Sequence, residues 1–377
     1  MSPRIVVVGA GYAGTALIQE LKPNPDLEVI WISASPYHLV KHEIHRVIRS
    51  PEIADGLQIP ITDMTSKGIA FENGRVTQVS AEDQTVHLAN GTSIPFDVLA
   101  ITAGARTAFY GIPGLDEHAQ TLSGIDDAQA IHDAVIGANV DPLRVIVGGG
   151  GLTGIQIAGE PTELAGQIDQ VIELTIVEAL DQILPNGPAP LRSRITEELD
   201  ARGIQTITGS PVVEATEDTV ILDEDRELPV DLLIWSGGIT GNNIDVTGDV
   251  DTTRNRLKAA PTLRTSDPRI FAFGDAAVIE QGDGIAPPTA QAAWQAAPTA
   301  AANIRATLAD EPLSTWEFTD KGTLISIGDT AVAHGIDNFP VPTFGSYPAA
   351  FLKKAVAARW IADVDTWQRA AKMWRSL

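Results

Sequence analysis

One pattern of strand, glycine loop and helix occurs twice in this chain, and this repeat constrains the fold more than any other feature. RIVVVGAGYAG (4–14) is echoed by RVIVGGGGLTG (144–154). Two further pairs of segments follow at similar offsets: 68–88 with 203–222, and 94–104 with 228–238. One architectural unit therefore occurs twice. A length of 377 residues also favours two or more domains.

Each unit alternates strands with a helix. A short β-branched strand runs into glycines and a helical stretch, and then into a second strand, LEVIWI (27–32) or ELTIVE (173–178). Strands that alternate with helices indicate a parallel sheet. A polar meander and a last apolar strand complete each unit. The sequence therefore predicts an α/β fold with two doubly wound, Rossmann-type domains, each with a β-meander insertion.

Both units carry G-x-G-x-x-G directly after the first strand. The glycines are Gly9, Gly11 and Gly14 in the first unit, and Gly149, Gly151 and Gly154 in the second. The first glycine permits a tight turn, the second lets the backbone approach a pyrophosphate, and the third lets helix and strand pack closely. The helix N-terminus then offers free N–H groups to the anion. A single such motif is weak evidence, but two inside a repeat predict two dinucleotide sites.

The residue that ends the second strand bears on the choice of dinucleotide. Glu178 stands there in the second unit, where a carboxylate can accept both ribose hydroxyls and repels a 2′-phosphate. This favours NAD over NADP, and the alternative is a solvated glutamate at a strand end. The first unit has Ser33, Ala34 and Ser35 instead. A serine binds a ribose more weakly, so the first dinucleotide needs other contacts.

Composition narrows the classes of function. A net charge of -23 argues against nucleic-acid binding and suits a salt-rich cytoplasm, such as that of a halophilic archaeon. No run of about 20 apolar residues and no secretion signal is visible, so the cytosol is the default. Cysteine is absent, which excludes disulfides and thiolate metal sites. His38, His42 and His45 have the spacing of one helical face, but we expect no metal; a proton relay through His38 or His42 is the alternative.

RIFAFGDAA (269–277), LAITAGART (99–107) and the two glycine loops resemble the FAD-dependent pyridine nucleotide-disulfide oxidoreductases. Within that superfamily the chain looks like the type II, non-proton-pumping NADH:quinone oxidoreductases, over nearly its whole length. PPTAQAAWQ (287–295) carries the most specific part of the resemblance, the pattern A-Q-x-A-x-Q. Thiol-dependent relatives are excluded because the chain has no cysteine.

The resemblance implies a flavoprotein that oxidises NADH by hydride transfer to FAD and reduces a membrane quinone, menaquinone in particular. It implies an FAD-binding domain over 1–110 and 243–325, an NADH-binding domain over 111–242 and a membrane-association region over 326–377. Besides the first three glycines it assigns to FAD the residues Ser35, Val79, Ala103, Gly104 and Asp275. Besides the second three and Glu178 it assigns to NADH the residues Thr153 and Gly237. Gln291 and Gln295, four apart on a helix, would face the quinone; the alternative is that they bond to neighbouring backbone.

The chain departs from the family at Ser33, on the FAD side, and at one position after the second glycine loop. The family usually has T-G-x-E after the second glycine loop, with the glutamate beside nicotinamide and flavin. Here LTGIQIAGE places Gln156 at that position, and Glu160 one helical turn later. Either Glu160 or water takes over any proton role, or none is needed. Two other functions stay open: a soluble NADH-dependent reductase of a small electron-carrier protein, and a nucleotide-binding redox sensor.

The C-terminal tail is basic and rich in tryptophan. On one helix Trp360, Val364, Trp367, Ala371 and Trp374 would fall in one stripe, with Lys354, Arg369 and Lys372 away from it. Tryptophan favours the membrane interface and basic residues favour anionic lipid. The sequence therefore predicts an amphipathic anchor over 347–377 that holds the protein peripherally on the cytoplasmic face of the membrane. The alternative is a helix–helix seam against the body or in a homodimer. Lys353 fits the stripe poorly.

Overall fold

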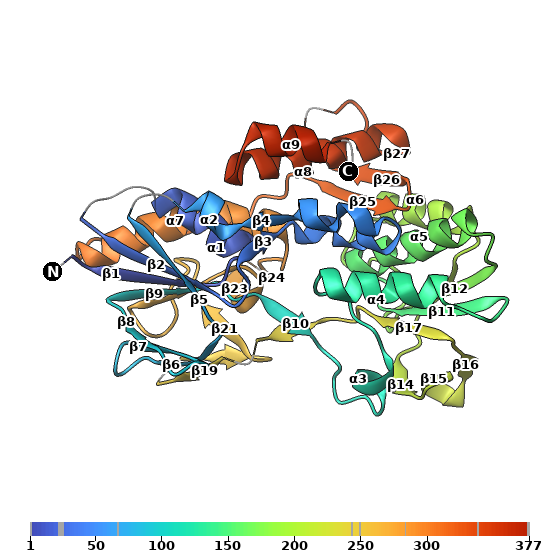
Figure 1. Ribbon diagram of the computed structural model, residues 1–377, viewed down its shortest axis with the longest axis horizontal. Helices are drawn as coiled ribbons and strands as arrows, with labels where there is room; N and C mark the ends of the chain where they lie inside the picture. Colours follow the sequence, from blue (N-terminus) through green and yellow to red (C-terminus); the bar gives the residue numbers. More distant parts are fainter. Residues whose placement is uncertain are drawn as a thin grey trace.

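The protein is an assembly of two parallel sheets with a helical and β-sheet cap, as a computed structural model shows (Figure 1). The structure describes residues 2–21, 26–65, 68–242, 244–248, 250–282, 284–337 and 339–374. The last three residues of the predicted anchor, 375–377, therefore lie outside the described residues.

The first sheet joins strands from both halves of the chain in the order β22-β9-β1-β2-β5, and all four pairings are parallel. Its strands are β1 (Arg4–Val8), β2 (Glu28–Ser33), β5 (Ile69–Asn73), β9 (Val98–Ile101) and β22 (Ile270–Ala272). The helices α1 (Tyr12–Leu21) and α7 (Ala290–Leu308) pack together over one face. Because β22 comes from near residue 270, this unit is discontinuous in sequence.

The second sheet has the order β13-β12-β11-β17, and its pairings are again parallel. This matches the order β5-β2-β1-β9 in the first sheet, which has β22 as an additional strand. Its strands are β11 (Leu143–Gly148), β12 (Ile172–Val177), β13 (Gln205–Ile207) and β17 (Leu232–Trp235). The helices of this unit are α4 (Ile125–Ile136), α5 (Leu152–Gln167) and α6 (Ala189–Asp200). Since β11, β12, β13 and β17 take the places of β1, β2, β5 and β9, the predicted repeat and fold class are confirmed.

Smaller sheets, whose pairings are mostly antiparallel, complete both units. The first meander contains β6 (Val76–Ser80), β7 (Thr85–Leu88), β8 (Ser93–Pro95) and β19 (Asp245–Thr247), and the second β14 (Val212–Ala215), β15 (Thr219–Leu222) and β16 (Glu227–Pro229). A further small sheet contains β20 (Thr252–Thr253), β21 (Arg256–Ala259), β23 (Ala277–Gln281) and β24 (Gly284–Ile285). The units are joined by β10 (Ala105–Thr107) and β18 (Ile239–Gly241), which pair antiparallel.

The predicted histidine face does not form. Between β2 and β5 the chain forms β3 (Tyr37–Leu39), η1 (Lys41–Ile48), η2 (Pro51–Leu57), β4 (Gln58–Pro60) and α2 (Ile61–Met64). His38 therefore lies in a strand, while His42 and His45 lie in a 3₁₀ helix.

One short helix, α3 (Leu115–His118), precedes α4.

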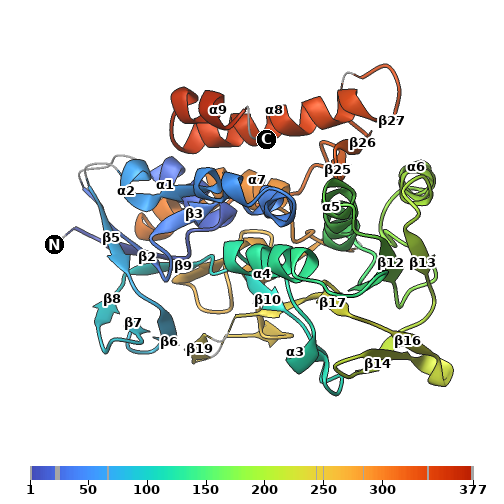
Figure 2. The same cartoon turned by 45° about the vertical axis from the view of Figure 1, so that its right-hand side comes forward.

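The C-terminal region covers both units (Figure 2). It consists of β25 (Thr323–Ile327), β26 (Thr330–His334), β27 (Thr343–Gly345), α8 (Tyr347–Val364) and α9 (Trp367–Met373). β25 packs against α5, and α8 packs against β26 and α1. The short remaining 3₁₀ turns are η3 (Asp223–Asp225) and η4 (Gly274–Ala276).

The prediction of one continuous amphipathic stripe is wrong. The helix breaks at Asp365, and Thr366 caps α9 by accepting a hydrogen bond from Arg369 N. Trp360 and Val364 are 2% and 4% exposed, whereas Trp367 is 67% exposed. The break changes the helical phase, and Trp360 fills a site in the body of the protein. Within the described residues, none of the helices combines the length and apolar character that crossing a bilayer requires.

Candidate dinucleotide and redox site

The two glycine loops have the same geometry at the carboxyl ends of β1 and β11. Gly9 and Gly149 have φ of 110° and 103°, a region that side chains avoid. A Cβ on Gly14 would lie 2.0 Å from the Gly9 carbonyl oxygen, and one on Gly154 would lie 1.8 Å from that of Gly149. Larger residues at these positions would therefore force the strand and its helix apart.

The middle glycine of each loop faces open space instead. A Cβ added to Gly11 or to Gly151 would meet nothing within 4 Å. These glycines are not needed for internal packing, and each precedes the N-terminus of a helix, α1 or α5. The open space at a helix N-terminus fits a pyrophosphate at both loops.

Other residues predicted to bind FAD are held around the same edge of the first sheet. Asp275 follows β22 in η4, where burial raises the pKa of its carboxyl while Lys41 and Arg256 oppose that shift. Ala103 and Gly104 follow β9, and the Asn242 amide donates to the Ala103 carbonyl. The carboxyl ends of parallel strands meet at one edge, so these residues accompany the first glycine loop.

The two remaining FAD predictions have less free surface. Ser35 follows β2, and its hydroxyl donates to the Tyr37 carbonyl at 3.0 Å. Val79 lies in β6 of the first meander and is fully buried. Any contact of Val79 with a dinucleotide would therefore involve its backbone, and its role stays a prediction.

Glu178 turns toward the second glycine loop. Its two carboxylate oxygens accept hydrogen bonds from Gly150 N at 2.7 Å and Leu180 N at 2.9 Å, and it is 8% exposed. A carboxylate has further lone pairs, so these bonds orient it and leave capacity for ribose hydroxyls. Thr153 is exposed in the first turn of α5, and Gly237 follows β17 beside the Trp235 ring. Glu178, Thr153 and Gly237 therefore lie at the carboxyl ends of β12, β11 and β17, which are neighbours in the second sheet.

The side chains of Gln291 and Gln295 form hydrogen bonds to nearby backbone, which was the alternative to contact with a quinone. The amide of Gln291 donates to Gly322 O at 3.2 Å and accepts from Lys321 N at 3.1 Å. The amide of Gln295 pairs in the same way with the N–H and carbonyl of Thr319, at 3.1 and 2.9 Å. The two glutamines therefore fasten the segment before β25 to α7. Contact with a quinone stays a prediction for both.

Gln156 and Glu160 lie on one side of α5 and differ in burial. The Gln156 amide is half-buried and donates to Ser326 Oγ at 3.1 Å. Glu160 is fully buried, 3.2 Å from Arg49 Nε. Burial raises the pKa of Glu160 to about 7, although Arg49 lowers it. A carboxyl that titrates near neutrality is suited to holding a proton.

The sequence did not point to the charged groups around Glu160. These are Glu43, Arg46, Arg49 and Lys353, which come from η1, its end and α8, and the neutral ring of His45 lies among them. Lys353 is 6% exposed and pairs with Glu43 at 3.0 Å. Its poor fit to the apolar stripe was the one signal that could have found it, since a lysine at a buried position needs an acidic partner.

His38 and Trp360 join the tail to the body. His38 Nδ1 bonds the Ala10 carbonyl at 2.8 Å, and Trp360 Nε1 donates to His38 Nε2 at 2.9 Å. Burial lowers the pKa of His38 to about 4, so the ring is neutral. Trp360 also packs against Tyr12 and Trp294. Both nitrogens of His38 are thus occupied, which disfavours it as a proton relay.

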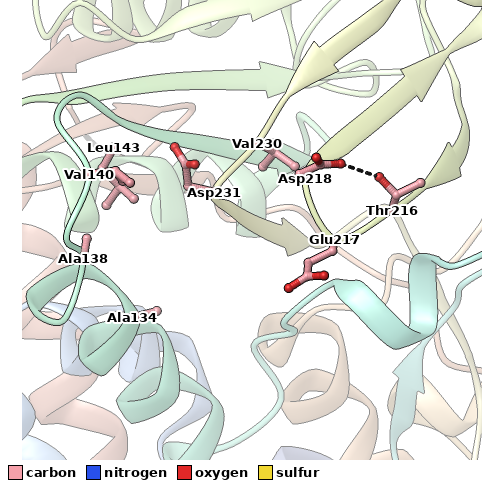
Figure 3. Close-up of a pocket in the computed structure, with 9 residues that line it drawn as sticks. All are labelled: Ala134, Ala138, Val140, Leu143, Thr216, Glu217, Asp218, Val230 and Asp231. Carbon is pink, nitrogen blue, oxygen red and sulfur yellow. Dashed lines mark hydrogen bonds between the residues drawn. The ribbon is translucent and has the colours of Figure 1, made fainter.

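A hollow on the second unit is separate from these groups (Figure 3). It measures about 530 Å³ and lies between the end of α4, the start of β11 and the second meander. Three carboxylates line it, Glu217, Asp218 and Asp231, and Asp231 is paired with Arg144. It opens at the start of β11, opposite the glycine loop, so it is not the dinucleotide site. Among the described residues no group of three or more histidines and acids has the arrangement of a metal site.

Comparison with known proteins agrees with this geometry. Residues 3–301 match the sequence profile of the pyridine nucleotide-disulphide oxidoreductases. A type II NADH:quinone oxidoreductase of Staphylococcus saprophyticus is 26% identical and covers 94% of both chains. One from Haemophilus influenzae is 27% identical over 91% of this chain and 88% of its own.

Solved structures share the fold. NDH2 from Plasmodium falciparum, solved in complex with NADH, superposes with a TM-score of 0.85 at 17% identity and covers 100% of this chain and 98% of its own. The sulfide:quinone oxidoreductase of Aquifex aeolicus gives 0.85 at 18% identity, with 96% and 91% covered. Both matches extend over the C-terminal region as well as the two sheets.

Proposed function

This chain belongs to the pyridine nucleotide-disulphide oxidoreductase family, and we propose that it works as a type II NADH:quinone oxidoreductase. It takes a hydride from NADH, passes two electrons through FAD to a quinone and pumps no protons. The observation that carries this proposal is the pair of open glycine cradles at equivalent edges of two like sheets. Relatives with this activity match more than nine-tenths of the chain.

The residues around the first cradle fit FAD. Gly11 leaves room for the pyrophosphate, and Gly9 and Gly14 hold the turn that presents it. Asp275 offers a partly buried carboxylate at the end of β22. Ala103 and Gly104 offer backbone at the neighbouring strand end, where Gly104 has φ of 72°. Bound there, FAD supplies the hydride-accepting and electron-donating chemistry.

The residues around the second cradle fit NADH. Gly151 leaves the space for the pyrophosphate, and Glu178 is fixed beside it by two backbone N–H groups. The protein thereby orients the nucleotide, which is its main contribution in a cofactor enzyme. A 2′-phosphate would meet the charge of Glu178, so NADH is favoured over NADPH.

The purified protein tests the function directly. We expect a yellow protein whose flavin absorbance bleaches with NADH under nitrogen and returns when a short-chain quinone is added. Rapid turnover with a quinone supports the enzyme over a redox sensor. Bleaching without reoxidation by any quinone, including a short-chain menaquinone analogue, would contradict the proposal.

Glu178→Ser should narrow the preference for NADH. The substitution removes the charge that opposes the 2′-phosphate, and it also removes the two bonds that orient the carboxylate. We expect the ratio of kcat/KM for NADH to that for NADPH to fall by roughly tenfold or more, since about 1.4 kcal/mol of discrimination suffices. Steady-state kinetics with both nucleotides measures it. An unchanged ratio would mean that Glu178 has no part in selection.

The outer face of the tail is the part of the protein that suits a membrane surface. Tyr347 and Phe351 are 71% and 62% exposed on α8, and Trp367 is 67% exposed on α9. The ring centroids of Phe351 and Trp374 lie 5.2 Å apart, so α8 and the end of α9 share this apolar surface. Basic Lys372 is exposed at the end of α9. Aromatic side chains with basic neighbours favour the interface of an anionic bilayer, and this face would hold the protein on the cytoplasmic side, near dissolved quinone.

Removing this aromatic face should release the protein from lipid. In the triple variant Tyr347→Ser, Phe351→Ser and Trp367→Ser, binding to vesicles of anionic phospholipid should fall roughly tenfold or more, because three exposed apolar side chains are lost. Turnover with a soluble short-chain quinone should persist. Cosedimentation measures the binding.

Two outcomes would count against the membrane surface. The control changes Ile168 and Val171 to serine, two exposed apolar residues outside the tail, and should bind vesicles like the wild type. If the triple variant also binds normally, the tail is no anchor. If it instead changes from dimer to monomer with unaltered lipid binding, the aromatic face is a subunit seam.

A further inference from the structure

A group of buried and half-buried polar side chains, most of them ionisable, lies between the helices that follow the two glycine loops. Its members come from four elements, η1 with its C-terminal residue, α5, β25 and α8: His42, Glu43, His45, Arg49, Gln156, Glu160, Ser326 and Lys353. Buried charges destabilise a fold unless they are paired, so such a group calls for an explanation.

Hydrogen bonds at Ser326 fix the state of His45. Lys353 Nζ, at 3.0 Å, and the Gln156 amide, at 3.1 Å, both donate to Ser326 Oγ. The serine hydroxyl must then donate its own proton to His45 Nε2, which is 2.7 Å away. His45 is therefore neutral, with Nε2 as an acceptor. Burial and the charge of Lys353 also lower the pKa of His45 well below its ordinary value.

Glu160 faces that acceptor. Its Oε1 lies 3.9 Å from His45 Nε2, and among the described residues neither of its oxygens has a hydrogen-bond partner. The carboxyl is half protonated near neutral pH, because burial raises its pKa to about 7. Because Ser326 already occupies the one lone pair of Nε2, a proton that leaves Glu160 passes to a water in this gap rather than to the ring.

The contacts continue to the first glycine loop. Lys353 Nζ pairs with Glu43 Oε1 at 3.0 Å, and Glu43 Oε1 lies 3.7 Å from His42 Nε2. His42 Nδ1 bonds the hydroxyl of Tyr12, which stands between Gly11 and Gly14. These side chains bring the group around Glu160 close to the start of α1, although no hydrogen bond joins Glu43 Oε1 to His42 Nε2 within the described residues.

We propose that Glu160 stores the proton that quinone reduction takes up and releases it, by way of water, toward the site between the two loops. This inference rests on the proposed function. NADH, a quinone and one proton give NAD⁺ and the quinol; the hydride brings two electrons and one proton, and the second proton comes from water by way of Glu160. Glu160 does not contact the substrate. It acts indirectly, by holding the proton until quinone reduction requires it. Gln156, which cannot titrate, lies one helical turn before it and donates to Ser326.

The sign of the pH dependence follows from the raised pKa. Glu160 holds its proton below about pH 7 and loses it above, so the rate of quinone reduction falls as the pH rises through neutrality. The charged groups that act on it are Arg46 and Arg49 of the η1 region, Glu43 of η1 and Lys353 of α8. His45 faces it from η1, β25 presents only Ser326, and His132 of α4 bonds the Ile48 carbonyl.

Glu160→Gln keeps the volume and removes the titrating group. We expect reoxidation of the reduced flavin by quinone to slow by roughly tenfold or more near neutrality, since positioned proton transfer contributes at least this much. The fall in rate above pH 7 should disappear, and flavin reduction by NADH should remain. Glu163→Gln is the matched control, because Glu163 lies on the same helix and pairs instead with Arg202. Stopped-flow kinetics at several pH values gives both half-reactions.

Two further measurements keep the proposal separate from the proposed function. Glu160→Gln combined with Gln156→Glu restores a carboxyl on the same face of α5, and should recover the lost pH dependence. In the wild type, infrared difference spectra should show a protonated carboxyl band that weakens when quinone is added to the NADH-reduced protein, and Glu160→Gln should lack it. A wild type that reduces quinone without such a band, or a variant with unchanged rate and pH profile, overturns the proton store. A wild type that reduces no quinone overturns the function.

Discussion

Gly151→Ala is expected to raise the KM for NADH by roughly 100-fold, about 2.7 kcal/mol, while the protein stays folded and yellow. The added methyl group meets no protein atom within 4 Å, and the φ of Gly151, −78°, suits alanine. It projects into the space where a pyrophosphate would approach the backbone. The loss therefore falls on nucleotide binding and spares the fold. Steady-state kinetics and thermal unfolding measure the two effects.

Gly166→Ala is the matched control for this prediction. Gly166 lies on the same helix, α5, and an added Cβ there also meets nothing within 4 Å. Alanine in the last turn of this helix should stabilise the protein by less than about 1 kcal/mol and leave the KM unchanged. If Gly151→Ala binds NADH like the wild type, the second loop does not hold the pyrophosphate. If it unfolds, the open space beside Gly151 has been misjudged.

The repeat made the fold predictable because its signals are local. A β-branched strand, a glycine turn and a helix lie within about fifteen residues, and the structure confirms a steric reason for the first and third glycine of each loop. The order of the two sheets follows from connections of the same kind in both units. The discontinuity of the first sheet was also visible, since RIFAFGDAA resembles a strand that ends at a cofactor-binding aspartate.

The tail was predicted less well because helical phase and burial depend on partners elsewhere in the chain. Spacing alone placed Trp360 and Trp367 on one face, but the break at Asp365 separates them. A tryptophan stripe does not reveal whether lipid or protein covers it. Tyr12 and Trp294, more than 60 residues away in sequence, cover Trp360.

The two glutamines show a similar limit. Their spacing correctly predicts one helical face, but it does not say what that face meets. In the structure the backbone of the segment before β25 occupies it. The group around Glu160 was beyond prediction for the same reason, because Glu43, Ser326 and Lys353 come together only through tertiary packing. The departure at Gln156 did raise the question of proton supply, with Glu160, water or no group at all as the alternatives.

Lys353→Met is expected to destabilise the protein by about 3–5 kcal/mol. Lys353 forms a buried ion pair with Glu43 at 3.0 Å and joins α8 to η1. Burial alone would raise the pKa of Glu43. Electrostatic interactions with Lys353, His42 and Arg46 outweigh burial and bring this pKa below its ordinary value, so the Glu43 carboxylate is ionised. Removing the lysine leaves that charge buried without its main partner, which is costly. Denaturant unfolding measures the loss.

Its neighbour and its partner provide the controls. Lys354→Met changes a more exposed lysine on the same helix and should alter stability by no more than about 0.5 kcal/mol. Glu43→Gln added to Lys353→Met removes the orphaned charge and should recover much of the stability, because replacing both partners of a buried pair is far less costly than removing one. If α8 and α9 unfolded independently of the two sheet units, Lys353→Met would leave the main unfolding transition of those units unchanged. A shift of that transition, with recovery in the double variant, would show that α8 is part of the folded core and that its outer aromatic face alone is free to meet a membrane.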